Sequence, residues 1–352
     1  MAMSSKNSNN KPVGVIGAGS FGLAIANILA KNSDVILYAR NPKVTAIISE
    51  KRKLHGQTIS EKIAPTNDLK YVAENCDVIF PIVPSQNFPA LIDDLSPFLK
   101  PYHILIHGTK GLIVSKDGWQ MDENMKIGKD DVYTMSRLIR ERTLAVRIGC
   151  LAGPNLAKEL ADNQPAATVV ASHFEEVISE GQRLLRNEIF QVYGSKDLLG
   201  IELTGVLKNI IAIAAGALSG MGYGENARSL LVSRGLIEMI YLGHMLGANT
   251  QAFLGLAGIG DLVATCSSKL SRNFTVGERL GKGEKLKDIL DSMEETAEGI
   301  NTIKIITRLV KGYQLRSPIT ESLYKVINGD MTIEEALRFL MKAPFNIDID
   351  FM

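Results

Sequence analysis

A glycine-rich turn between an apolar segment and a helix-like segment is the feature that most constrains this chain. Val13–Ile16 is a short apolar run typical of a buried parallel strand, and Gly17, Gly19 and Gly22 follow it in the spacing GxGxxG. The Ala/Leu/Ile-rich residues that come next predict a helix. A strand, a tight turn and a helix N-terminus in this order can bind a dinucleotide pyrophosphate. A non-catalytic nucleotide sensor would carry the same residues.

Length and charge narrow the class of protein. A chain of 352 residues can form two domains of ordinary size. Its 45% hydrophobic and 22% charged residues are typical of a globular protein. The net charge of +1 gives no reason to expect nucleic acid or a membrane surface as a partner.

The cysteines and the N-terminus indicate a cytoplasmic protein. Cys76, Cys150 and Cys266 are odd in number and far apart, so they predict neither a disulfide framework nor a metal site. Residues 1–10 are polar and lack the apolar segment of a signal peptide, so we expect a disordered leader. No membrane span is expected, because the most apolar segment, 210–218, is too short.

The first half of the chain alternates short apolar runs with helix-like segments. After Val13–Ile16, strands are expected at 35–39, 78–83, 104–106, 168–171 and 190–193. Strands that alternate with helices form right-handed crossovers, so we expect a doubly wound, Rossmann-like α/β domain with a mostly parallel sheet. Its ligand site should lie beyond the carboxyl ends of the strands.

The pattern changes near Gly194. From Leu198 onward only helices are expected, over 198–219, 226–247, 272–280, 284–291, 299–312, 319–327 and 332–341. The sequence therefore predicts a dinucleotide-binding domain at 11–195 and an all-α substrate-binding domain at 196–352.

Arg40 follows the second expected strand closely, in Tyr38-Ala39-Arg40-Asn41. An Asp or Glu at this position would bind the ribose 2′-hydroxyl of NAD, whereas an arginine can hold the 2′-phosphate of NADP. Arg40 therefore favours NADP(H). NAD(H) stays possible, because an arginine can also stack on adenine.

Lys208 is the only charged residue between Glu202 and Glu225, in a segment that is apolar on almost every helical face. A buried lysine needs a partner or a chemical role, and burial beside a second cation would lower its pKa toward the working pH. Lys110, between glycines after an expected strand, could be that cation. Alternatively, Lys208 reaches solvent past the helix edge, and Lys110 is a solvated loop lysine.

Asp261 is the one carboxylate in a loop of small residues ahead of a helix. It is expected to cap that helix, with one oxygen available to meet Lys208. The Gly153-Pro154-Asn155 turn, which follows the run 146–151, either brings backbone N–H groups to the cleft or is only a turn.

Ser271-Arg272-Asn273 opens the next expected helix. Ser271 is a good N-cap, so the helix start and Arg272 together suit a phosphate or another anion. A capped surface helix is the alternative. The five histidines show no metal-ligand spacing, so no metal is expected.

Seven short motifs follow one another in a specific order and spacing. They are Gly17-Ala-Gly-Ser-Phe-Gly22, Thr109-Lys-Gly111, Ala152-Gly-Pro154, Glu202-Leu-Thr-Gly-Val-Leu-Lys-Asn209, Gly258-Ile-Gly-Asp-Leu262, Ser271-Arg-Asn273 and Ala297-Glu-Gly299. With them the chain resembles, over nearly its whole length, the bacterial type of NAD(P)-dependent glycerol-3-phosphate dehydrogenase. One position departs: the family commonly has Ser where this chain has Asn155.

The resemblance implies reversible hydride transfer between NAD(P)H and dihydroxyacetone phosphate, giving sn-glycerol 3-phosphate for phospholipid synthesis, in a cytoplasmic homodimer. Lys208 would be the proton donor and acceptor, with Lys110 and Asp261 as further catalytic residues. The implied cofactor contacts are Gly17, Gly19, Ser20, Phe21, Gly22, Arg40, Lys110, Ala157, Arg272 and Glu298. The implied substrate contacts are Lys110, Gly153, Asn155, Lys208, Asp261, Ser271, Arg272 and Asn273.

Two other functions share some of these features. A two-domain dehydrogenase acting on a 3-hydroxy acid or a ketopantoate-like substrate would also have the glycine turn and a lysine in the helical domain. The Ser271-Arg272-Asn273 helix start disfavours it, because that start suits phosphate. A non-catalytic NADP sensor is disfavoured by Lys208, since a sensor needs no proton donor there.

Overall fold

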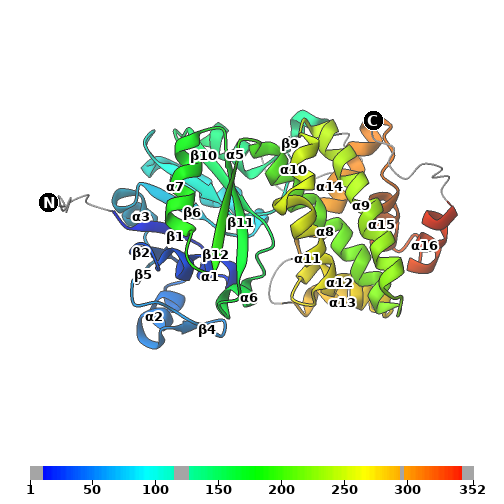
Figure 1. Ribbon diagram of the computed structural model, residues 1–352, viewed down its shortest axis with the longest axis horizontal. Coiled ribbons are helices and arrows are strands. Elements are labelled where there is room, and N and C mark those ends of the chain that lie inside the picture. The colour runs from blue at the N-terminus through cyan, green and yellow to red at the C-terminus, as the bar shows by residue number, and fades with distance from the viewer. Residues whose placement is uncertain (1–10, 115–126, 294–296, 343–352) are drawn as a thin grey trace.

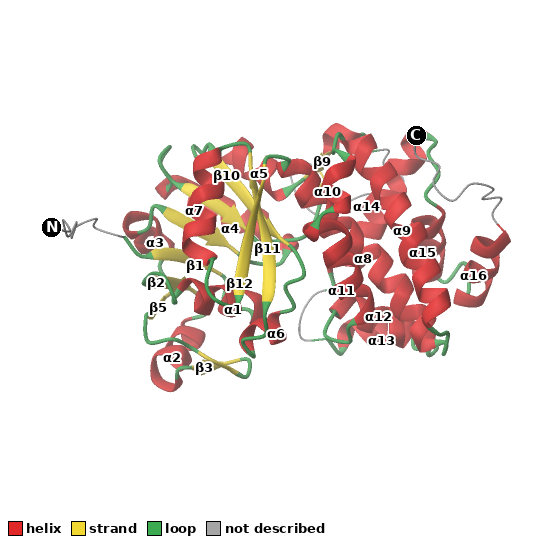
Figure 2. Ribbon diagram, in the orientation of Figure 1, coloured by secondary structure: helices red, strands yellow, loops and turns green. Residues whose placement is uncertain are grey.

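The computed structural model describes residues 11–114, 127–293 and 297–342, so the expected leader at 1–10 lies outside the described residues. The large sheet occupies one half of the molecule, and the helices of the second half of the chain, among them α8 (Leu198–Gly220), pack together in the other (Figures 1 and 2). The expected combination of a Rossmann-like domain and a helical domain is therefore confirmed.

An eight-stranded sheet organises the first half, in the order β12-β11-β10-β7-β6-β1-β2-β5. Neighbouring strands are parallel except β10 and β11, which are antiparallel. The strands of this sheet are β1 (Val13–Ile16), β2 (Val35–Tyr38), β5 (Ile63–Thr66), β6 (Val78–Pro81), β7 (Ile104–His107), β10 (Arg147–Ala152), β11 (Ala166–Ser172) and β12 (Phe190–Ser195). The chain order reverses beside β1, which is where an open α/β sheet forms its ligand crevice.

Every strand expected in the first half is present, and two further strands of this sheet, β5 and β10, were not predicted. The edge strand β5 contains Pro65, which tends to exclude a segment from the interior of a sheet but is tolerated at its edge. β10 coincides with most of the apolar run 146–151, and Gly149 within it lowers its strand propensity.

Helices cover both faces of the sheet, as a doubly wound fold requires. One apolar cluster packs α1 (Ser20–Leu29), α6 (Ala157–Ala161) and α7 (Glu175–Leu185) on one face. A second cluster packs α3 (Leu69–Asn75), α4 (Phe88–Leu95) and α5 (Met135–Arg142) on the other. The smaller elements are α2 (Pro42–Lys51), β3 (Lys53–Leu54), β4 (Gln57–Thr58), β8 (Ile113–Val114), β9 (Val132–Tyr133) and the 3-10 turns Ser85–Asn87, Ser96–Phe98 and Lys129–Asp131.

The second half contains only helices among its described residues, as expected. Besides α8 they are α9 (Glu225–Leu246), α10 (Thr250–Leu254), a π-helical turn (Leu256–Gly260), α11 (Asp261–Ser267), α12 (Arg272–Gly281), α13 (Leu286–Asp291), α14 (Glu298–Tyr313), α15 (Pro318–Asn328) and α16 (Ile333–Lys342). The seven expected helices occur within two residues of their expected ends. Three helical segments lie outside the expected ranges: α10, the π-helical turn and α11. α10 was missed because five residues are too few to show a periodic pattern.

α8 is the central helix of this half. By length and composition it could cross a membrane, so the apolar segment is longer than the expected 210–218, but 94% of its most apolar window is buried inside the protein. The apolar side chains of α8 therefore form the core of the helical half.

Glycines let α12 cross α8 closely. A Cβ at Gly277 would lie 1.9 Å from the Ile213 carbonyl oxygen, and one at Gly216 would lie 2.0 Å from that of Phe274. Contacts this short exclude any side chain at either position. The close approach keeps the start of α12 beside the middle of α8, where Lys208 lies.

Candidate active site

A cleft of about 920 Å³ lies between the carboxyl edge of the sheet and the helical half. It receives the loops that follow several of the parallel strands, together with residues of α8, α11, α12 and α14. Apart from Gly153, every expected site residue lines this cleft: Gly17, Gly19, Ser20, Phe21, Gly22, Arg40, Lys110, Asn155, Ala157, Lys208, Asp261, Ser271, Arg272, Asn273 and Glu298.

The glycine turn has the geometry that a dinucleotide site needs. Gly17 has a φ of +124°, and a Cβ there would lie 2.0 Å from the Ile82 carbonyl oxygen. A Cβ at Gly22 would lie 2.0 Å from the Gly17 carbonyl oxygen, so only glycine lets α1 start this close to the turn. Gly19 is the exposed N-cap residue of α1. The N-terminus of α1 is therefore open to a pyrophosphate.

Arg40 lies two residues beyond β2 and is exposed in the cleft. A short hairpin of β3 and β4 lies near the same end, and His55 at its tip also lines the cleft. The hairpin is held by Gln57, whose amide donates to the Ser20 carbonyl oxygen at 2.8 Å. This end of the cleft therefore offers an exposed cation beside a hairpin that is held in place.

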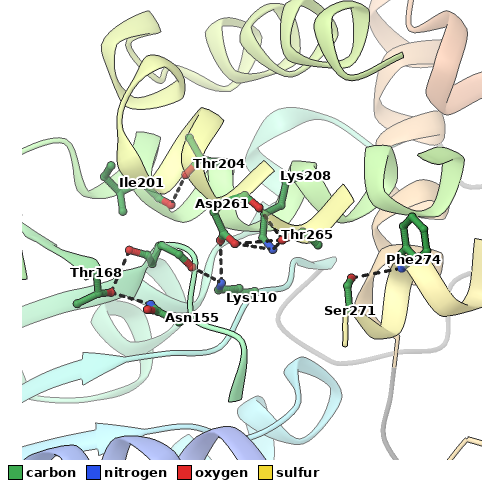
Figure 3. Close-up of polar contacts among 12 residues, drawn as sticks. Lys110, Asn155, Thr168, Ile201, Thr204, Lys208, Asp261, Thr265, Ser271 and Phe274 are labelled. Carbon is green, nitrogen blue, oxygen red and sulfur yellow. Dashed lines mark hydrogen bonds and ion pairs between the residues drawn. The ribbon is translucent and has the colours of Figure 1, made fainter. Parts of the chain in front are cut away.

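Two lysines share one buried carboxylate at the centre of the site (Figure 3). Lys110 Nζ, from the loop after β7, lies 2.9 Å from Asp261 Oδ2. Lys208 Nζ, from α8, lies 3.0 Å from Asp261 Oδ1. The Lys208 and Asp261 side chains are only 6% and 3% exposed, whereas that of Lys110 is 21% exposed. The cluster joins the two halves of the molecule.

The cluster shifts the pKa of two of its members. Burial lowers the pKa of Lys208 to about 8; the Asp261 carboxylate opposes this shift, and the Lys110 ammonium adds to it. Burial alone would raise the pKa of Asp261, but the charges of Lys110 and Lys208 outweigh it and hold that pKa below its usual range. Lys208 can therefore exchange a proton near neutral pH, while Asp261 stays ionised.

Thr265 is a member of the site that the sequence analysis did not assign. Its hydroxyl accepts from Lys208 Nζ at 2.5 Å and donates to the Asp261 carbonyl oxygen at 2.6 Å. The signal was the spacing of four residues between Asp261 and Thr265, which places both on one face of a helix. The small residues before Asp261 predict a loop, and in a loop this spacing would place no two residues on one face.

The expectation that Asp261 caps a helix from a loop was wrong. Asp261 is the first residue of α11, its N-cap position belongs to Gly260, and the preceding residues form the π-helical turn. Both carboxylate oxygens bind lysines, so neither caps the helix. Small residues such as Gly258 predicted a loop, but a Cβ there would lie 2.1 Å from the Phe253 carbonyl oxygen, so close packing is what requires them.

The Ser271-Arg272-Asn273 segment begins α12 as expected. The Ser271 hydroxyl accepts from the backbone N–H of Phe274 at 3.3 Å, which confirms the N-cap. The side-chain oxygen of Asn273 accepts from the backbone N–H of Gly299 at 2.9 Å, so Asn273 also fixes the start of α14. Arg272 follows the cap directly and lines the cleft.

Glu298 connects α14 to the α/β half. Its carboxylate accepts from the Ser85 backbone N–H at 2.8 Å and from the Ser85 hydroxyl. Burial raises the pKa of Glu298, although the bonds from Ser85 and the charge of Arg272 oppose that shift.

The turn after β10 lies at the sheet side of the cleft. The Gly153 carbonyl oxygen accepts from Lys110 Nζ at 3.4 Å, so Gly153 touches the lysine although it does not line the cleft. The Asn155 amide lies 2.8 Å from the Thr168 hydroxyl. Ala157 is the first residue of α6 and lines the cleft.

A Rossmann-like sheet edge and a buried lysine of lowered pKa on opposite sides of one cleft define an NAD(P)-dependent dehydrogenase. Models of two protein domains match the chain: the N-terminus of NAD-dependent glycerol-3-phosphate dehydrogenase at residues 12–178 and its C-terminus at 197–338. The chain belongs to this family.

Individual relatives agree with the family models. The chain is 37% identical to a glycerol-3-phosphate dehydrogenase [NAD(P)+] of Pseudomonas aeruginosa (strain LESB58), over 97% of each chain. It is 38% identical to the enzyme of that name from Syntrophobacter fumaroxidans, over 96% of this chain and 98% of the relative. The crystal structure of glycerol-3-phosphate dehydrogenase from Coxiella burnetii superposes with a TM-score of 0.84 at 30% identity, over 95% of this chain and 99% of the other.

Proposed function

We propose that this protein reversibly reduces dihydroxyacetone phosphate to sn-glycerol 3-phosphate with NAD(P)H, and so supplies phospholipid synthesis. The observation that carries the proposal is Lys208. It is buried, paired with Asp261, and faces the same cleft as the glycine turn. Membership of the family supports the choice of substrate.

The residues at the sheet edge fit a dinucleotide. The pyrophosphate would bind at the N-terminus of α1, beside Gly19 and Ser20. Arg40 would hold the adenosine end, and Ala157 and Glu298 line the cleft nearer the lysines. When bound, the nicotinamide supplies the hydride that adds to the carbonyl carbon of the substrate.

Lys208 donates the proton to the ketone oxygen. Negative charge develops on that oxygen during reduction, and an ammonium group beside it stabilises the charge before it supplies the proton. In the reverse direction the neutral amine of Lys208 accepts the proton from the hydroxyl. Asp261 holds Lys208 and Lys110 apart at fixed distances, so Lys110 adds positive charge to the site without displacing the proton donor.

The start of α12 binds the substrate phosphate. Arg272 and the first N–H groups of the helix supply positive charge, and Ser271 fixes the start of the helix. Asn273 binds Gly299 through its oxygen, so its amide nitrogen is the atom that donates to substrate. Asn155 closes the opposite side of the substrate site, and Gly153 supports it by accepting from Lys110.

The remaining properties follow from this function. We propose cytoplasmic location and a homodimer, with NADP(H) preferred over NAD(H) because of Arg40. We also propose a domain division at 195–196, which the end of β12 at Ser195 and the start of α8 at Leu198 support.

Replacing Lys208 with Ala should abolish NADPH oxidation with dihydroxyacetone phosphate and leave the Kd for NADPH within about twofold, because Lys208 moves a proton but does not hold the cofactor. Steady-state assays and fluorescence titration measure the two quantities. Lys304→Ala is the matched control, because Lys304 is exposed on α14. Near-normal turnover in Lys208→Ala, or faster turnover of unphosphorylated keto acids by the unaltered protein, would contradict the proposal.

The pH profile should follow the lowered pKa of Lys208. Reduction needs the ammonium form, so its kcat/KM should fall as the pH rises above about 8. Oxidation needs the neutral amine, so its kcat/KM should rise through the same range. Initial rates in both directions between pH 6.5 and 9.5, about one to two units on each side of that pKa, test this pairing. Profiles that change in the same direction would contradict it.

Replacing Arg40 with Ala should raise the KM for NADPH by roughly tenfold or more and leave that for NADH nearly unchanged, because only NADPH carries the 2′-phosphate. Lys43→Ala is the control: Lys43 is an exposed cation three residues away that does not line the cleft. An unchanged ratio of the two Michaelis constants would assign the 2′-phosphate to another residue.

A further inference from the structure

A second buried polar cluster connects the two halves of the molecule beside the cleft. His107 ends β7, Ser136 lies in the first turn of α5, and Glu202 lies in the second turn of α8. His107 Nε2 lies 2.9 Å from Glu202 Oε1 and 3.0 Å from Ser136 Oγ. The Ser136 backbone N–H also donates to Glu202 Oε1, at 3.0 Å. None of these residues lines the cofactor cleft.

The cluster is not a hydrolytic triad. Ser136 and Glu202 meet the same ring nitrogen of His107, whereas a triad needs them on opposite nitrogens. His107 Nδ1 is buried and has no hydrogen-bond partner among the described residues. A proton there would be a buried donor without an acceptor, so we assign Nε2 as the ring nitrogen that donates. Glu202 is the acceptor on which two donors converge.

The cluster and the two lysines of the site lie along the same stretch of α8. Glu202, Gly205 and Lys208 are spaced three residues apart on α8, so they form a row that turns around the helix by about 60° at each step. Glu202 meets His107, and a Cβ at Gly205 would lie 3.6 Å from Cγ of Lys110. Lys208 meets Asp261, which in turn binds Lys110. The segment from His107 to Lys110 therefore runs along α8 from Glu202 to Lys208.

We propose that Glu202 is a positioning residue for the reaction. By accepting from His107 and from the start of α5, it fixes the register of α8 against β7, and with it the placement of Lys208 and Lys110 around Asp261. The proposal rests on the proposed role of Lys208. A displacement of about 1 Å at a reacting group can reduce turnover roughly 100-fold.

Glu202→Leu removes the acceptor, and Glu202→Gln keeps an oxygen that can serve both donors. We expect kcat for dihydroxyacetone phosphate to fall about 10- to 100-fold in Glu202→Leu and to return to within about fivefold of the unaltered protein in Glu202→Gln. The Kd for NADPH should stay within about twofold in both, because Glu202 does not line the cofactor cleft.

Glu238→Leu is the matched control. Glu238 is also a buried carboxylate of the helical half, and it accepts from the backbone N–H groups of Ile319 and Thr320. Its loss should lower the melting temperature at least as much as Glu202→Leu does, yet leave kcat within about twofold. An equal loss of kcat in Glu238→Leu would show that lowered stability alone explains the effect, and would overturn the proposal.

A second pair of variants decides the matter if Glu202→Leu does not fold. His107→Leu removes the donor to Glu202, whereas His107→Gln can donate from nearly the same point. We expect a fall in kcat of at least about tenfold in the first and of less than about threefold in the second. Equal kcat values in the two His107 variants would overturn the proposal.

The test separates this proposal from the proposed function. Near-normal turnover by Lys208→Ala in the same assay would mean that the proposed proton donor is misassigned, whatever Glu202 does. An inactive Lys208→Ala together with a Glu202→Leu of unchanged kcat would leave the donor assigned and overturn only the positioning role.

Discussion

The pair of ion contacts made by Asp261 is the interaction on which the rest of the structure depends. Its two oxygens bind Lys110 from the α/β half and Lys208 from the helical half. A buried lysine or carboxylate alone is strongly unfavourable, and removing one partner of such a pair typically costs about 3–5 kcal/mol. The cluster places one negative charge between two positive charges. When both lysines are protonated, the excess positive charge suits an anionic substrate and the negative charge that develops on a ketone oxygen.

Close packing around α8 keeps this cluster in place. Gly216 and Gly277 bring α12 against α8, and Asn273 ties the start of α12 to Gly299 of α14. Glu298 then connects α14 to Ser85 on the other side of the cleft. The start of α12, Lys208 on α8 and the loop after β6 are thus held by one continuous set of contacts. The chemistry needs this rigidity because proton transfer requires heavy atoms within hydrogen-bond distance.

Much of the fold and of the site was predictable because local patterns specified it. Alternating apolar runs gave most of the sheet, and the GxGxxG spacing located the cofactor turn, whose glycines are required by a positive φ at Gly17 and by the close contact at Gly22. Lys208 was noticeable because it is the only charge in a long apolar helix. The resemblance to a known family added Glu298 and Ala157 as expected cofactor contacts, which no local pattern indicates.

The remainder depends on packing between residues distant in the sequence. β5 was missed because a proline is tolerated only at its edge position. The π-helical turn before α11 was missed because its small residues resemble a loop until Gly258 is packed against Phe253. Thr265 and Glu202 have ordinary identities and acquire their importance from partners more than 50 residues away, as the contacts Lys208–Thr265 and His107–Glu202 show. The spacing of four residues from Asp261 places Thr265 beside that carboxylate, but a single sequence does not show the distant partner of either residue.

Direct titration of the Lys208 side chain tests the account most closely. Nuclear magnetic resonance of the protein with labelled lysine, assigned by comparison with Lys208→Ala, measures the pKa of that ammonium group without any assumption about the reaction. The account predicts a pKa of about 8. A pKa at or above 10.5, the ordinary lysine value, would show that burial and Lys110 do not lower it, and would contradict the central claim that this buried cluster prepares Lys208 to exchange a proton.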